Sequence, residues 1–197
     1  MTNSFLFEKV IYMKCIKIIT DKDFNLKSIS FDNPRHRYAS RGIVLNNDGK
    51  VAILNKKKKH EYKLVGGGIE FNENPKEAFI REVYEETGCR ISIVDELGVI
   101  EEEKSLDNFK QTSYIYVARV VDNTGKLHLT QKEMDEGAVL LWLDINYALF
   151  LIKESLNNIN ASKYENLYHS RFIVKRDYEI LKYYINYISI KKNSFNS

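Results

Sequence analysis

Three glutamates, Glu82, Glu85 and Glu86, are the residues whose type and spacing are best suited to chemistry. On an α-helix, positions i, i+3 and i+4 lie on one face. Carboxylates placed in this way repel one another, and each like-charged pair costs an isolated helix about 0.2–0.5 kcal/mol. A bound hard divalent cation makes the same cluster favourable, because carboxylate oxygens are suitable ligands for Mg²⁺ or Mn²⁺. A solvated acidic helix face explains the same residues, so the helix alone leaves both interpretations open.

The segment that must position these glutamates has a helix signal at each end. Asn74 is a good N-cap, Pro75 fits the first helical position, and Glu77 completes a capping box with Asn74. Gly88 can adopt the left-handed conformation that ends a helix. The sequence therefore predicts a helix over 75–87. At about 100° per residue, the predicted buried face contains Phe79, Ile80, Val83 and Thr87, whereas small Ala78 lies with the acids.

Three consecutive glycines, Gly66, Gly67 and Gly68, come shortly before this helix. Glycine allows a backbone to bend sharply or to approach a ligand closely. A flexible turn explains the glycines equally well. They do not form a P-loop, since no Gly-Lys-Ser or Gly-Lys-Thr follows.

The glycines and the helix together resemble the Nudix box. The resemblance is carried by Gly67, by Glu73, and by the run Arg81-Glu82-Val83-Tyr84-Glu85-Glu86-Thr87-Gly88-Cys89. The one soft departure is Cys89, where an aliphatic residue is usual, and cysteine is a small apolar substitute. The sequence is therefore identified as a member of the Nudix hydrolase family, also described as MutT-like.

This resemblance implies both a fold and a catalytic site. The implied fold is an α/β/α sandwich with a mixed β-sheet, here with a C-terminal helical extension. The implied activity is Mg²⁺- or Mn²⁺-dependent cleavage of a diphosphate bond by an activated water. By carry-over, the metal ligands are the Gly66 carbonyl and the carboxylates of Glu82, Glu85 and Glu86. Arg81 and Glu73 complete the implied catalytic set, and we expect them to pair and to orient the loop.

Residues outside the box are weaker candidates. A further acid that accepts the proton of the water is sought among Glu101, Glu102, Glu103, Glu133 and Glu136. Glu133 and Glu136 are favoured because they shortly precede the strand that ends at Trp142, although each is also explained as a solvated loop acid. Lys57, within the run Lys56–Lys59, and Tyr114 are candidate substrate contacts. A solvated turn is the favoured explanation of the lysines, and packing explains Tyr114 equally well.

The remaining sequence predicts a sheet assembled around the helix. Asn46-Asn47-Asp48-Gly49 is a hairpin signal between two apolar runs. We expect strands at 13–19, 26–31, 43–45, 51–54, 62–65, 69–71, 91–94, 98–100, 114–121, 127–129 and 139–143, and helices at 144–157 and 171–188. We divide the chain into an N-terminal extension of strands in the same domain (1–40), a Nudix core (41–157) and a C-terminal helical extension (158–197). In that extension Arg171, Lys175 and Arg176 are taken as a solvated helix face by default.

The composition of the chain limits the kinds of binding partner and the cellular compartment that we expect. The net charge of +3 is small for 197 residues, which argues against duplex nucleic acid as the main partner. Cys15 and Cys89 do not suggest a disulfide framework, so we expect a reduced, cytoplasmic compartment. Residues 1–10 resemble neither a signal peptide nor a membrane span. The tyrosine-rich C-terminal helix can mediate a homodimer or cover the sheet, and both possibilities stay open.

The substrate is the least defined part of this prediction. No proline follows Pro75, and the marks typical of ADP-ribose, NADH and coenzyme A pyrophosphatases are absent. With those three classes disfavoured, we expect a nucleotide diphosphate substrate of the nucleoside triphosphate or nucleotide-sugar type. The alternative is a non-catalytic protein of the same fold that senses or regulates through a nucleotide. The intact box favours the enzyme, and the modest charge gives no support to an RNA channel.

Overall fold

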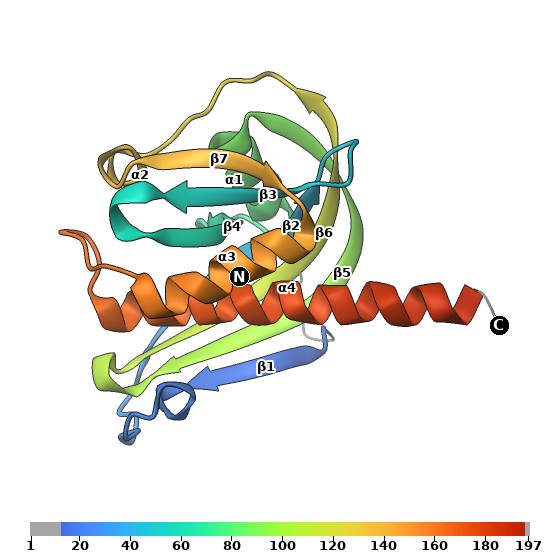
Figure 1. Ribbon diagram of the computed structural model, residues 1–197. Coiled ribbons are helices and arrows are strands. Elements are labelled where there is room, and N and C mark those ends of the chain that lie inside the picture. Colours follow the sequence, from blue (N-terminus) through green and yellow to red (C-terminus); the bar gives the residue numbers. More distant parts are fainter. Residues whose placement is uncertain (1–12, 196–197) are drawn as a thin grey trace.

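A computed structural model describes residues 13–195 of the chain. Its centre is a seven-stranded mixed sheet with the strand order β1-β5-β6-β2-β4-β3-β7 (Figure 1). The strands are β1 (Cys15–Thr20), β2 (Arg35–Leu45), β3 (Val51–Lys56), β4 (Glu61–Gly68), β5 (Cys89–Lys104), β6 (Phe109–Asn123) and β7 (Ala138–Leu143).

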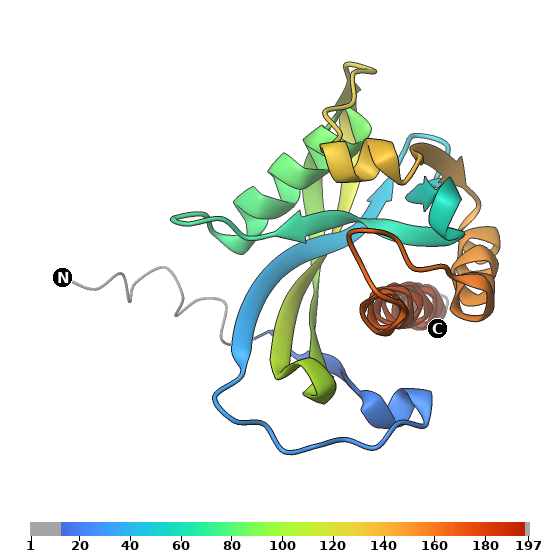
Figure 2. The same ribbon diagram turned by 90° about the vertical axis from the view of Figure 1, so that its left-hand side faces the viewer.

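Helices cover both faces of this sheet. They are α1 (Pro75–Thr87), α2 (Gln131–Asp135), α3 (Ile145–Asn158) and α4 (Leu167–Phe195). The sheet curves around α4, which is seen end-on in Figure 2, and α1 lies on the opposite face. Helix α3 packs beside α4. The α/β/α sandwich with a mixed sheet and a C-terminal helix is therefore confirmed. The strand β1 and the helix α4, which lie outside 41–157, pack on the same sheet as the rest.

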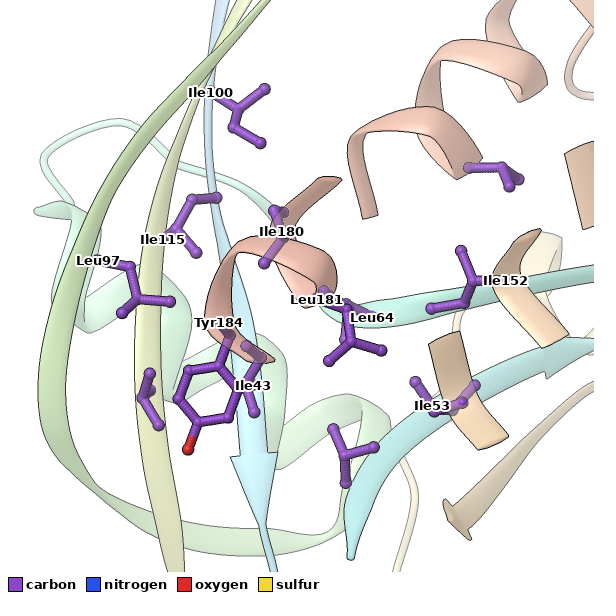
Figure 3. Packing of buried hydrophobic residues seen from close by; sticks show 14 of the residues in the cluster. Ile43, Ile53, Leu64, Leu97, Ile100, Ile115, Ile152, Ile180, Leu181 and Tyr184 are labelled. Atoms are coloured by element: carbon purple, nitrogen blue, oxygen red, sulfur yellow. The ribbon is translucent and has the colours of Figure 1, made fainter. Parts of the chain in front are cut away.

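Two apolar clusters hold the layers together, one on each face of the sheet. The cluster on the α3 and α4 face includes Ile43, Leu64, Ile115, Ile152 and Leu181 (Figure 3). The cluster on the α1 face is smaller, and there the Phe79 and Tyr116 rings stack with centroids 5.5 Å apart. Alternate residues of β2 and β4 enter the two clusters, as the period of a strand buried on both faces requires.

The register of the central strands places the box against β2. Strand β2 pairs in parallel with β6 and antiparallel with β4, so that Arg41 lies opposite Gly66 and Ser40 opposite Gly67. The β2–β3 hairpin turns at Asn46 and Gly49, where Gly49 has a φ of 75°, as its sequence predicts. The glycines at the end of β4 thus lie directly beside the middle of β2.

Three short strand predictions are wrong. Residues 26–31 are not a strand, because the chain there travels from β1 at the sheet edge past β5 and β6 to reach β2. Residues 69–71 leave the sheet after the Ile69 amide donates to the Tyr38 carbonyl, and the Phe71 side chain is 94% exposed. Residues 127–129 cross the C-terminal end of α1 instead, where the His128 amide donates to the Glu85 carbonyl.

No helix within residues 13–195 is long and apolar enough to cross a membrane. Residues 1–10, for which neither a signal peptide nor a membrane span is expected, lie outside the described part of the chain.

Candidate active site

Helix α1 has the ends that its sequence predicts. The Asn74 side chain accepts from the amides of Lys76 and Glu77, the Glu77 side chain accepts from the Asn74 amide, and Gly88 has a φ of 69°. The predicted buried face is wrong in one position, because Ile80 is 44% exposed. The buried stripe instead runs through Phe79, Val83 and Glu86, so Ile80 lies at its solvent edge. Ala78, which helix geometry places on the side of the acids, is fully buried.

Glu86 is the buried member of the three carboxylates, with 3% of the residue exposed. Its Oε2 accepts a hydrogen bond from the Gly66 amide at 2.7 Å, and its Oε1 pairs with Lys63 Nζ at 3.0 Å. Burial raises the pKa of Glu86 to about 7, against the opposing effect of Lys63. The helix therefore directs one carboxylate inward, at the point where β4 ends.

Arg81 organises the rest of the box. Its guanidinium forms a two-pronged ion pair with Glu73 at 2.8 and 2.9 Å and donates to the Gly68 carbonyl at 3.0 Å. It also contacts Glu82 at 3.0 Å and Glu85 at 3.3 Å. Hydrogen bonding to Arg81 lowers the pKa of Glu73. Arg81 thus ties the loop that follows the glycines to the acidic face of α1.

The space beside Gly66 and Gly67 is too small for a side chain unless a neighbour shifts. A side chain at Gly67 would place its Cβ 2.3 Å from a carboxylate oxygen of Glu82. At Gly66, where φ is 129°, a Cβ would lie 2.4 Å from the Ser40 carbonyl oxygen and 2.5 Å from the Arg41 Cα. Backbone atoms cannot give way, so Gly66 must be glycine, whereas a side chain at Gly67 would displace the flexible carboxylate of Glu82.

The glycines open into a pocket of about 380 Å³. One wall carries Glu82 and Glu86 from α1, and the rest of the lining includes residues of β2, β5, β6 and α4, which we call the α4 wall. Its charged lining residues are the bases Arg37, Arg41, Lys56, Lys63, Lys104, Lys132 and Arg176 and the acids Glu61, Glu82, Glu86, Glu133 and Glu165. Cations predominate, so the pocket suits an anionic occupant.

The structure brings some of the predicted site residues together. Gly66, Glu82, Glu86 and Glu133 line this pocket, and Arg81, Glu73 and Glu85 adjoin it through the contacts of the Arg81 guanidinium. Glu133 comes from the short helix α2 and lies within hydrogen-bonding reach of Glu86, near Lys63.

The other three predicted substrate contacts lie elsewhere. Glu136 is 2% exposed and pairs with Lys56 at 2.8 Å. Lys57 is exposed and begins a short 3₁₀ turn. Tyr114 belongs to the apolar cluster beneath α1, and its ring lies 6.5 Å from that of Tyr38. None of the three lines the pocket.

Several charged residues that sequence analysis assigned to solvent are buried. Lys59 is 1% exposed and pairs with Glu61 at 2.6 Å and Glu165 at 2.7 Å, so the solvated-turn interpretation is wrong there. Arg176, taken as part of a solvated helix face, is 2% exposed. Glu102, whose default interpretation was a solvated loop acid, is fully buried within β5. Pairing with residues distant in the chain explains each case, because a charge can be buried only if it is compensated.

The residues present fit a hard divalent cation by their chemistry. Glu86 and Glu133 place two carboxyl groups within hydrogen-bonding reach in a buried pocket, which favours either a shared proton or a cation. Within residues 13–195 no three acidic, histidine or cysteine side chains already converge on one point. Arg81 contacts Glu82 and Glu85, and Lys63 contacts Glu86. A cation would therefore replace these contacts.

A three-layer α/β/α fold whose glycine-rich strand end leads into an acidic helix defines the class of protein. The chain belongs to the NUDIX domain family, whose model matches residues 35–166. The match takes in the glycines, α1 and Glu133, and it ends just before α4.

Individual relatives agree with this assignment. The chain is 33% identical over 66 residues to a MutT-like protein of Streptomyces ambofaciens. This match covers 34% of this chain and 43% of that protein. It is 35% identical over 79 residues to an RNA pyrophosphohydrolase of Bartonella quintana (strain Toulouse), covering 36% of this chain and 43% of that protein. The matches thus span less than half the length of either relative. A solved NUDIX hydrolase from Nitrosomonas europaea shares the fold, with a TM-score of 0.51, 16% identity and coverage of 73% of this chain and 93% of that one.

Proposed function

We propose that this protein is a Mg²⁺- or Mn²⁺-dependent hydrolase that cleaves the diphosphate bond of a nucleotide compound. The observation that supports it most is the position of Glu86, buried between Lys63 and the Gly66 amide and facing Glu133. This acidic group opens into a pocket whose other charges are mainly cationic. Acids that hold a cation, beside bases that hold phosphates, are the combination that diphosphate hydrolysis needs.

The proposed metal ligands are Glu82, Glu85, Glu86 and the carbonyl of Gly66. A divalent cation bound there supplies charge neutralisation for the phosphates and lowers the pKa of a water. Arg81 and Glu73 act as positioning residues, because their ion pair fixes the loop that carries Gly68. Lys63 lies beside Glu86 and offers its ammonium group to a phosphate once it is released from that carboxylate.

Glu133 is our candidate for the group that accepts the proton of the attacking water. It is the one favoured loop acid that lines the pocket, and its carboxylate accepts from the Thr130 amide and hydroxyl, both at 2.9 Å. In the proposed step the water oxygen bonds to one phosphorus and the bond to the bridging oxygen breaks. The second phosphate leaves with that oxygen, and the proton passes to Glu133.

A second cleft, next to the pocket, supports a nucleotide as the substrate. It has a volume of about 410 Å³ and is lined by Tyr38, His36 and Phe71, with Arg37 shared between cleft and pocket. The His36 and Tyr38 rings are stacked with centroids 4.7 Å apart. Exposed aromatic faces bind nucleobases by stacking, so we place the base here and the phosphates in the pocket.

The remaining predictions also stand as proposals. Lys57, Tyr114 and Glu136 are kept as candidate substrate contacts of lower rank, since each lies outside the pocket. A nucleoside triphosphate or a nucleotide-sugar is the proposed substrate type, and the relative described as an RNA pyrophosphohydrolase agrees with an anhydride of this kind. A cytoplasmic location, a homodimer through α4, and the division of the chain at residues 40 and 157 are proposed on the sequence alone.

The test is hydrolysis of a panel of nucleoside triphosphates, nucleotide sugars and dinucleotides with Mg²⁺ and then Mn²⁺. Glu86→Gln keeps an oxygen that can accept from the Gly66 amide but loses the charge, and turnover should fall on the order of 10³-fold. Glu77→Gln is the matched control on the same helix, because glutamine also completes a capping box. If no compound turns over while a nucleotide binds wild type and Glu86→Gln equally, the protein is a sensor and the hydrolase proposal fails.

A further inference from the structure

Arg41 is a buried cation that nothing in the described part of the chain neutralises directly. The residue is 4% exposed, lies in the middle of β2 and lines the pocket. Its Nε has no hydrogen-bond partner, and no hydrogen bond or ion pair joins its guanidinium to another residue of 13–195. A buried charge without a partner destabilises a protein. The arginine at this position therefore does not serve the stability of the fold.

The two acids whose charges act on Arg41, Asp177 and Glu102, are already paired with other cations. Glu102 pairs with Lys104 at 3.0 Å and with Arg176 at 3.0 Å, and Asp177 pairs with Arg176 at 2.8 Å. Three cations therefore share two carboxylates, and one positive charge is unmatched. Burial lowers the pKa of Arg41 to about 10, which leaves it protonated at neutral pH.

Arg41 is also close to the proposed cleavage site. It lies opposite Gly66 in the β2–β4 ladder, and a Cβ built on Gly66 would lie 2.5 Å from the Arg41 Cα. The amide of the same glycine donates to Glu86. Only the backbone of Gly66 therefore lies between Glu86 and Arg41. Both side chains line the same pocket.

Part of the pocket lining comes from outside the family match. His169, Ile173 and Arg176 of α4 line the pocket there, and the match to the NUDIX domain ends at residue 166. Arg37, four residues earlier on the same face of β2, lines the pocket and its aromatic neighbour. Arg37 and Arg176 are also close enough to Arg41 to lower its pKa, so this part of the pocket is a cationic subsite that is built partly from this chain's own C-terminal helix.

We propose that Arg41 binds an anionic group of the substrate that lies beyond the bond on which Glu82 and Glu86 act. The planar guanidinium offers two parallel donors to a phosphate or carboxylate. This inference rests on the proposed function and narrows it to diphosphate compounds that carry a further anionic group, such as a third phosphate or an acidic sugar. A compound with a neutral group at that end leaves Arg41 without a partner and is a poorer substrate.

The test is binding of inorganic pyrophosphate in the presence of EDTA, measured by calorimetry and by the shift of the thermal midpoint. Arg41→Met removes the unmatched charge and keeps an apolar stem, so we expect a midpoint equal to or above that of wild type. Pyrophosphate affinity should fall at least about tenfold, as expected for loss of a charge-assisted pair of hydrogen bonds. Arg119→Met, at an exposed position of β6, is the control and should bind as wild type does.

Equal pyrophosphate affinity in Arg41→Met and wild type overturns the proposal. If Arg41→Met does not fold, Arg41→Lys takes its place, because lysine keeps the charge but lacks the two-pronged geometry. An Arg41→Lys variant that binds pyrophosphate as tightly as wild type also overturns the proposal. The binding assay needs neither metal nor turnover, so it separates this inference from the hydrolase proposal. With an identified substrate, Arg41→Met should raise KM at least about tenfold and change kcat less, whereas an unchanged KM contradicts the assignment.

Discussion

The two walls of the pocket hold their charges in different ways. On the α1 wall, Arg81, whose side chain is 26% exposed, contacts both Glu82, which lines the pocket, and Glu85, which adjoins it. On the α4 wall, Arg176 lines the pocket and pairs at 3.0 Å with Glu102 of β5 behind it, and both residues are almost completely buried. Screened, partly exposed pairs contribute little to stability, whereas breaking a buried pair is costly. The first wall can therefore exchange partners, and the second is a fixed framework.

The largest effect that we expect is on the fixed wall. Burial raises the pKa of Glu102, but Lys104, Arg176 and Arg41 outweigh it and lower this pKa from 4.5 to about 2. A depressed pKa gives stability that is present above pH 4.5 and is lost as the pH falls towards 2. Glu102→Gln should lower the free energy of unfolding at neutral pH by about 3 kcal/mol or more. Its stability should also depend less on pH within that window.

Denaturant unfolding between pH 2 and 7 measures both quantities. The control is Glu96→Gln, which breaks a surface ion pair with Lys76 and should lie within about 1 kcal/mol of wild type. If Glu102→Gln is no less stable than the control, the α4 wall is not the framework described above.

The exchangeable wall should show the opposite behaviour. Arg81→Gln removes the contacts to Glu73 and to the Gly68 carbonyl, and we expect activity to fall about 10–100-fold with a much smaller change in stability. Glu73→Gln should have a similar effect, and the double variant should be little worse than either single one, since the two residues act as a unit. Additive losses in this double-mutant cycle would show that Arg81 and Glu73 act separately.

The aromatic lining of the second cleft should have the smallest effect. Phe71 is 94% exposed, so Phe71→Ala should leave the midpoint of thermal unfolding unchanged. If the base of the substrate stacks there, KM should rise about tenfold. Leu106→Ala, at another exposed apolar side chain that lies outside this cleft, is the control. An unchanged KM would place the base elsewhere.

The sequence predicts one wall of the pocket well and the other poorly. Asn74, Pro75 and Gly88 mark the ends of α1, and its glutamates lie within five residues of one another, so local periodicity is enough to assemble that wall. Arg41, Glu102 and Arg176 come from β2, β5 and α4, and only the sheet order brings them together. No spacing along the chain encodes such a cluster, so the sequence pattern predicts a solvated helix face at Arg176. One signal was present, since Arg41 immediately precedes an apolar run in a strand.

The strand errors have a related cause. Residues 26–31 contain the apolar residues Leu26, Ile29 and Phe31, yet they connect an edge strand to a central one and cross the sheet instead of joining it. Phe71 follows Ile69 in an apolar pattern, but the chain has left the β2 ladder by that point. Short apolar runs take their conformation from the path that the topology imposes, and local propensity does not reveal that path.

Binding of Mn²⁺ to wild type, Glu82→Gln and Glu86→Gln, followed by electron paramagnetic resonance, tests the central claim most directly, because it needs no knowledge of the substrate. The account predicts that wild type binds Mn²⁺ and that each variant binds it at least about 10–100-fold more weakly. Glu77→Gln, outside the acidic face, should bind as wild type does. Equal Mn²⁺ affinity in all four proteins would contradict the assignment of helix α1 as the metal site.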